Sequence, residues 1–128
     1  MKSNEPGLKN AFDQALENKT AFILNWKFPV EDIVFNIKGV YPSLDISSLP
    51  EKQVLGDWIE PMMLNGKEYS FKSDSPTLIL DVISTVNQEI LKQGNTFVWY
   101  DTQDDNYNFI LISQTELPFY LEKGFKQV

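Results

Sequence analysis

The sequence predicts one α+β domain, in which a mainly antiparallel sheet is covered by helices packed mostly on one face. The chain has 128 residues, the usual length of a single domain. Segments with the apolar spacing of helices alternate with runs of β-forming residues, in the order α, β, α, irregular β, α, β, β, α. That order fits an α+β sheet. We expect residues 1–128 to form this domain, with residues 1–6 disordered.

The first third of the chain predicts a helix, a strand and a second helix. Apolar residues recur at helical spacing over residues 8–18, which predicts a short amphipathic helix. Residues 20–28 are rich in β-formers and predict a mostly buried strand. Pro29 suits the first turn of the next helix, because its missing N–H is not needed there. Gly39 is placed where a left-handed residue would end that helix.

Residues 41–74 predict irregular β structure. Pro42, Pro50 and Pro61 should interrupt any long element in this segment. Asn65-Gly66 lies between two apolar stretches and predicts a β-hairpin with a type I′ turn, whose two central residues need positive φ.

The last part of the chain predicts a helix, a hairpin and a short final helix. Apolar residues after Pro76 recur at helical spacing and predict a helix that ends at Gly94. Residues 96–100 and 107–113 are apolar and aromatic, and the polar residues between them predict an antiparallel hairpin. Residues 115–123, followed by Gly124, predict the last helix.

The composition excludes many kinds of catalytic site. All eleven cationic residues are lysines, and the chain has neither arginine nor histidine nor cysteine. A Ser-His-Asp or Cys-His site, a His/Cys zinc site, an iron–sulfur cluster, a disulfide framework and an arginine finger therefore lack their residues. Glycine-rich phosphate loops and a G-x-S-x-G elbow are also missing from the sequence. We therefore expect no enzyme activity and no cofactor.

The charge balance indicates the class of partner. Eighteen Asp and Glu residues against eleven lysines give a net charge of −7. This charge repels nucleic-acid phosphates and anionic lipid headgroups, so neither is expected as a partner, whereas a basic protein partner would be steered towards it. The N-terminal residues lack an apolar leader, and the sequence lacks an apolar stretch of membrane-spanning length, so we expect a cytoplasmic protein.

The segment from residue 41 to residue 60 is the first candidate partner-binding patch. It interleaves acidic residues with apolar and aromatic ones, the composition of a surface that captures a basic partner through buried anchors and steering acids. The alternative is a loop that packs its apolar side chains into the core and leaves its acids solvated. The candidate binding residues of this patch are Asp45, Asp57, Trp58 and Glu60.

The polar turn of the last hairpin is a competing patch. Asp101, Asp104 and Asp105 supply three carboxylates there, which could bind a basic partner or a calcium ion. Their spacing does not match a calcium-binding EF-hand loop, and Asp is a common turn residue, so a metal-free turn is the preferred interpretation. Trp26 and Trp99 are expected to lie in the core.

Two stretches of the sequence resemble a family of small bacterial α+β domains of unknown function. They are Phe22–Lys27 followed by Glu31–Ile33, and Trp99–Thr102 followed by Asp105–Phe109. The small, acidic profile without catalytic residues also resembles the immunity proteins encoded beside polymorphic toxins, including those of contact-dependent growth inhibition systems. That class implies a role but supplies no binding residues, because its members differ in sequence and fold.

This resemblance implies an immunity protein that binds a cognate basic toxin domain, such as a nuclease, and occludes its active site. We expect a monomer in a 1:1 complex. Two alternatives remain at this point: a metal-dependent enzyme or calcium-binding module that uses the Asp101–Asp105 turn, and an adaptor domain with an unrelated protein partner.

Overall fold

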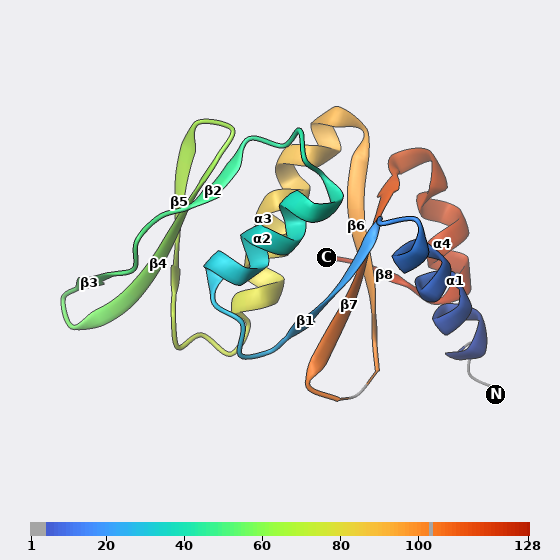
Figure 1. Cartoon of the computed structure of the whole chain (residues 1–128), viewed down its shortest axis with the longest axis horizontal. Coiled ribbons are helices and arrows are strands. Elements are labelled where there is room, and N and C mark those ends of the chain that lie inside the picture. Colours follow the sequence, from blue (N-terminus) through green and yellow to red (C-terminus); the bar gives the residue numbers. More distant parts are fainter. Residues whose placement is uncertain (1–4, 103) are drawn as a thin grey trace.

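The computed structural model describes residues 5–102 and 104–128, which form helices on both sides of one sheet and a second sheet beyond them (Figure 1). The helices are α1 (Glu5–Glu17), α2 (Val30–Val40), α3 (Leu78–Ile90) and α4 (Leu117–Lys123). The strands are β1 (Ala21–Asn25), β2 (Ile46–Ser48), β3 (Lys52–Val54), β4 (Asp57–Leu64), β5 (Lys67–Lys72), β6 (Asn95–Asp101), β7 (Asn106–Ser113) and β8 (Lys126–Gln127). Short 3-10 turns follow α3 at Leu91–Gln93 and precede α4 at Gln114–Glu116.

The first sheet has the strand order β1-β7-β6-β8, and its neighbouring strands are all antiparallel. β6 and β7 form the predicted hairpin, with Val98 opposite Ile110. β1 pairs with the other side of β7, where Ala21 lies opposite Ile110. β8 closes the far edge by pairing with β6. The chain therefore brings its first strand and its last strand into one sheet.

The second sheet is built around β4. β5 pairs with β4 along one side, while β3 and β2 pair in succession with the other side. We expected Pro61 to interrupt any long element, and this is wrong, because β4 runs through it. Pro61 lacks an N–H to donate, and it lies between the residues of β4 that pair with β3 and those that pair with β2. Its carbonyl accepts a hydrogen bond from Leu49 N–H at 3.0 Å.

The elements stack in four layers, which Figure 1 shows from α1 and α4, through the first sheet and then α2 and α3, to the second sheet. One core lies around α2 and α3 and contains side chains of both sheets. A smaller core joins α1 and the α4 region to the opposite face of the first sheet. The α+β class and the antiparallel pairing are confirmed.

The helices cover both faces of the first sheet, where we expected them mostly on one face. The strands explain this difference, because successive side chains point to opposite faces and both sets are apolar. Phe97 packs into the larger core while its neighbour Val98 packs into the smaller one. Phe109 and Ile110 divide in the same way. Such strands require a cover on each face.

Several local predictions are confirmed and others are wrong. Asn65 and Gly66 have φ of 52° and 83°, as the predicted type I′ turn requires. Gly94 and Gly124 have positive φ at the ends of their helical segments, as expected. Gly39 does not end α2, which continues to Val40 and is capped at Tyr41.

The N-terminal prediction and one tryptophan also need correction. We expected residues 1–6 to be disordered, but α1 begins at Glu5, since Pro6 needs no N–H partner in the first turn. Residues 1–4 lie outside the described residues. Trp26 follows β1 rather than lying within it, and it is exposed, so its assignment to the core is wrong. Trp99 packs at the edge of the larger core.

Candidate functional site

The β3–β4 hairpin extends beyond the two helices that cover the rest of the second sheet, and Figure 1 shows it projecting from the body. We call residues 54–58 at its end the hairpin apex. Its apolar side chains face solvent: Val54 is 45% exposed, Trp58 is 53% exposed and Leu55 is fully exposed. Further along β4, Met62 and Leu64 are fully buried in the larger core. The same strand therefore runs from the core to an exposed apolar end.

The turn of the hairpin apex places a leucine in an unfavourable conformation. Val54 pairs with Asp57, so Leu55 and Gly56 are the two turn residues, with φ of 52° and 88°. Positive φ brings the Cβ of an L-residue close to the following carbonyl oxygen, at a cost of about 1–2 kcal/mol. Glycine avoids this cost, but Leu55 does not. Because Leu55 is also fully exposed, its side chain gains no burial within the fold.

Charged side chains flank the hairpin apex. Lys72 Nζ lies 3.7 Å from Asp57 Oδ2, and both side chains are more than half exposed. Ion pairs with this exposure contribute about 0–1 kcal/mol. A shallow cavity of about 240 Å³ lies between the apex and the residues after β5, and Ser73 and Asp74 line it. The apex therefore combines apolar anchors with two nearby carboxylates, those of Asp57 and Asp74.

The first predicted patch is divided by the structure. Asp57 and Trp58 lie together at the hairpin apex. Asp45 is exposed near the opposite end of β4, where its carbonyl accepts the Asn65 N–H at 2.8 Å. β4 spans eight residues, so these two ends are about 23 Å apart at ~3.3 Å per residue. Glu60 is buried and does not belong to a surface patch.

Glu60 instead stabilises the start of α2. Pro29 precedes this helix and provides no side-chain cap. Glu60 Oε1 accepts a hydrogen bond from Val30 N–H at 2.7 Å, which satisfies one of the free amides at the helix N-terminus. Glu60 faces inward because it lies on the same face of β4 as Met62 and Leu64, two residues apart. Glu60 therefore lies inside the fold, apart from the exposed patch in which we expected it.

The second predicted patch lies at the tip of the β6–β7 hairpin. Asp104 and Asp105 are exposed. Asp104 Oδ1 accepts hydrogen bonds from Thr102 Oγ1 at 2.6 Å and from Asn106 N–H at 2.8 Å. These two bonds hold the pKa of Asp104 below its usual value, since they favour the charged form.

Asp104 therefore organises the turn with one of its oxygens. Asp101 ends β6 opposite Tyr107, and its side chain lies outside the described residues. Within the part of the chain that the structure describes, three or more metal-ligating side chains do not gather at any point. The calcium interpretation of this turn stays a prediction.

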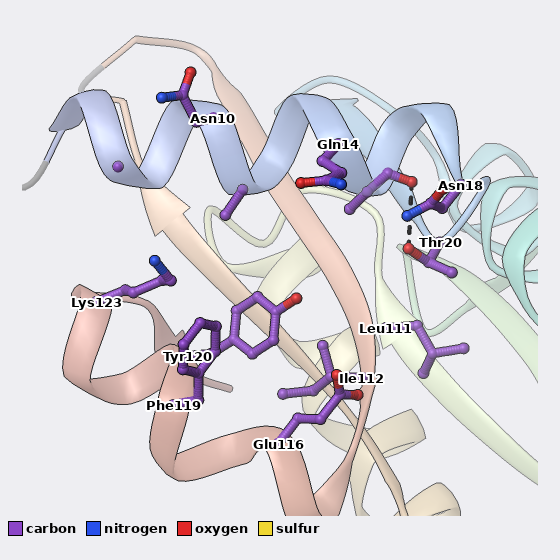
Figure 2. Close-up of a pocket in the computed structure, with 13 residues that line it drawn as sticks. Asn10, Gln14, Asn18, Thr20, Leu111, Ile112, Glu116, Phe119, Tyr120 and Lys123 are labelled. Carbon is purple, nitrogen blue, oxygen red and sulfur yellow. Dashed lines mark hydrogen bonds between the residues drawn. The ribbon is translucent and has the colours of Figure 1, made fainter.

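A polar groove between α1 and α4 was not anticipated from the sequence (Figure 2). It encloses about 520 Å³ above the first sheet. Asn10, Gln14 and Asn18 line it from the α1 side, at the i, i+4, i+8 spacing of one helix face. Tyr120 lies on the α4 side, and burial, followed by the charge of Glu116, raises its pKa. The regular spacing of the three amide residues is the sequence pattern that could have revealed this groove.

Among the described residues, no helix combines the length and the apolar character that a membrane span requires. No family model matches the chain, and no curated protein or solved structure matches it either.

Proposed function

We propose that this chain is an immunity protein, which binds a basic toxin domain and occludes its active site with the hairpin apex as the central contact. The observation that carries the proposal is the projecting apex with Leu55 and Trp58 exposed at its end. The complex is a 1:1 complex formed in the cytoplasm, and it requires no cofactor and no covalent step.

The apolar side chains of the apex would supply the binding energy. Tryptophan is enriched among the interface residues that dominate binding, and such residues cluster where water is excluded. Leu55 holds a strained backbone conformation without burial in the free protein. An interface would bury its side chain, and at ~25 cal/mol per Å² that burial would offset the strain. Stability of the free fold gives no comparable reason for leucine at this position.

The charge of the chain would supply steering. A net charge of −7 attracts a basic partner over about 8–10 Å in ordinary salt and raises its rate of association. Clefts that bind nucleic acid carry positive charge for the substrate phosphates. Asp57 and Asp74 flank the apolar end of a projecting hairpin. In a nuclease cleft, their carboxylates would occupy positions that phosphates otherwise take.

The test is co-purification of the tagged protein with the toxin domain encoded by the gene immediately upstream, followed by rescue of cells that express this toxin. We expect stable 1:1 binding and rescue. In the double variant Leu55→Asp, Trp58→Ala, we expect affinity to fall by about 100-fold or more, the usual result of losing two central anchors. Leu121→Asp is the control, because Leu121 is an exposed leucine on α4, remote from the hairpin.

The association rate tests the steering step separately. Asp57→Lys should slow association and reduce its salt dependence. Asp13→Lys is the matched control, since Asp13 is also an exposed aspartate paired with a lysine, but it lies on α1. Binding and rescue that survive the double variant would contradict a role for the apex. Binding without rescue would favour an adaptor domain over an immunity protein.

A further inference from the structure

β1 leaves one edge of the first sheet open. It is the terminal strand in the order β1-β7-β6-β8, and among the described residues no strand pairs with its outer side. An edge strand presents backbone groups that can pair with another chain, and natural proteins often protect it with charges, proline or a bulge. β1 has the sequence AFILN, which contains neither proline nor a charged residue.

The hydrogen-bond pattern shows which groups face outward. Trp26 N–H donates to the Asp105 carbonyl at 2.9 Å, and Leu111 N–H donates to the Thr20 carbonyl at 2.8 Å. Even-numbered residues of this segment therefore bond to β7, and the odd-numbered ones face away in an antiparallel ladder. The N–H and C=O groups of Ala21 and Ile23 consequently point to the open edge. A strand placed there could form hydrogen bonds with both residues.

A groove runs beside this edge. We call it the β1 edge groove; it encloses about 560 Å³ between β1, the end of α1 and the second half of α2. Phe35 on α2 lines it and is 78% exposed, and Leu16 lines it from α1. Ile23 on the strand itself is 45% exposed. Phe35 lies on the α2 side of the sheet and Leu16 on the α1 side, so an added strand would find apolar surface for both sets of its side chains.

The charge of the groove is opposite to that of the whole chain. Lys19 and Lys38 line it, and its described lining contains no acidic residue. Lys27 lies just beyond the other end of β1. In a chain of net charge −7, this concentration of lysines favours an occupant with acidic residues beside its apolar ones.

We propose that the β1 edge groove binds an extended, apolar segment with acidic ends from another polypeptide, which adds to the first sheet as a fifth strand beside β1. Recognition by strand addition combines main-chain hydrogen bonds with side-chain pockets on alternate faces. A second copy of this chain fits less well, because antiparallel pairing of two β1 strands centred on Ile23 brings Lys19 of one copy next to Lys27 of the other. The proposal does not depend on the toxin-binding role of the hairpin apex.

The probe is a fluorescein-labelled peptide of Val and Ile residues with Asp residues at each end, and the readout is fluorescence anisotropy with the full chain. We expect saturable binding that Ile23→Pro weakens by about tenfold or more, because proline removes the outward N–H. The ladder to β7 does not use this N–H, so proline is compatible with the position. Ile23→Thr is the matched control, since it changes the same side chain but keeps the N–H, and it should bind within about threefold of the original chain.

Two further comparisons keep the test independent of protein folding. A peptide N-methylated on every amide should not bind, whereas a peptide N-methylated on alternate amides can still turn its free amides towards β1 and should bind. Lys19→Glu should weaken binding by roughly threefold, whereas Lys92→Glu, at an exposed lysine beyond α3, should not.

Binding of the fully N-methylated peptide, or loss of binding by the alternately methylated one, would overturn strand addition. Equal binding of Ile23→Pro and Ile23→Thr, or failure of the original chain to bind the probe, would also overturn it. A concentration-dependent dimer that Ile23→Pro abolishes would assign the edge to a second copy instead.

Discussion

The two sheets of this molecule are covered to different extents. The first sheet has helices on both faces, and Phe97, Val98 and Phe109 in its central strands are fully buried. The second sheet packs on α2 and α3 through β2, β5 and the second half of β4, and the hairpin apex extends past these helices. Apolar side chains in the first sheet stabilise the fold, whereas those at the apex are between about half and fully exposed and are available to a partner.

The two turns at the ends of β4 sharpen this difference. Leu55-Gly56 and Asn65-Gly66 both have two residues with positive φ, and the first residue has φ of 52° in each. Asn tolerates this conformation and Leu does not. The turn near the core therefore has the residue that local stability favours, and the exposed turn has one that it disfavours. Under the proposed function, selection for contact rather than for stability would account for Leu55 in the exposed turn.

The largest expected effect separates a core residue from an apex residue of similar size. Phe97→Ala should lower the free energy of unfolding by about 4 kcal/mol, because it removes a fully buried ring that packs against Phe22. Trp58→Ala should lower it by less than about 1 kcal/mol, since Trp58 is half exposed. Urea unfolding measures both values. If Phe97→Ala fails to fold, Phe97→Leu provides the same comparison at a smaller cost, and equal effects of the leucine and Trp58 variants would contradict the division of roles.

The second expected effect concerns two acids on β4 that the sequence placed together. Glu60→Ala should destabilise the fold by about 2 kcal/mol, because it removes a charged acceptor from the N-terminus of α2. Glu60→Gln should cost less, because the amide oxygen can still accept the Val30 N–H. Asp57→Asn should change stability by about 0.5 kcal/mol or less, since its ion pair is exposed. Equal costs at residues 57 and 60 in urea unfolding would show that Glu60 has no special role.

A third effect tests the two turns. Leu55→Asn should stabilise the fold by roughly 0.5–1 kcal/mol, because it relieves the unfavourable backbone conformation. Asn65→Leu should destabilise it by about 1 kcal/mol, for the opposite reason. Thermal melts measure both changes, and a stabilised Leu55→Asn variant that also binds its partner less well would link the strained leucine to contact.

The sequence predicted the first sheet better than the second. The β6–β7 hairpin and α3 were predictable because each has a long periodic apolar pattern, and such patterns reflect burial. β2 and β3 have only three residues each, too few to show a period, and both depend on pairing with β4. Pro61 prevented the prediction of β4, because proline is found in strands mainly where no neighbouring strand needs its N–H. In β4 this position is the gap between the residues that pair with β3 and those that pair with β2. That gap follows from tertiary pairing and is not visible in local sequence.

The candidate site was predictable in part. Asp57 and Trp58 are neighbours in the sequence, so they lie close together in any fold. The mixed acidic and aromatic composition of this segment was therefore enough to name both as candidates. Glu60 was placed on the surface in error. Alternate side chains of β4 point towards the helices, but β4 was not recognised in the sequence, so Glu60 could not be assigned to that inward face. Leu55 was missed, although a leucine before glycine in a two-residue turn is an unusual local feature. Asp104 was predicted to be a turn residue, and its hydrogen bonds to Thr102 and Asn106 agree with that prediction.

The smallest expected effect lies on the face of the first sheet that α1 and α4 cover. Burial and then the negative charge of Glu116 raise the pKa of Tyr120. The folded protein therefore keeps this phenol neutral to higher pH than the unfolded chain, whose tyrosines titrate near pH 10 or so. The corresponding stability is present below that pH and is lost as the pH rises through the folded pKa.

Ultraviolet absorbance of the phenolate measures this titration directly. Tyr120→Phe should remove a late-titrating component, and Glu116→Gln should move that component to lower pH without reaching the ordinary value, because burial is the larger cause. Gln at this position can still cap Ser113, which the Glu116 carboxylate now does, so the helix start is preserved. If Tyr120→Phe instead removes a component that titrates at the ordinary pH of tyrosine, the α1–α4 groove leaves this residue as solvated as the hairpin apex leaves Trp58, and the contrast between the two sheets does not extend to their polar side chains.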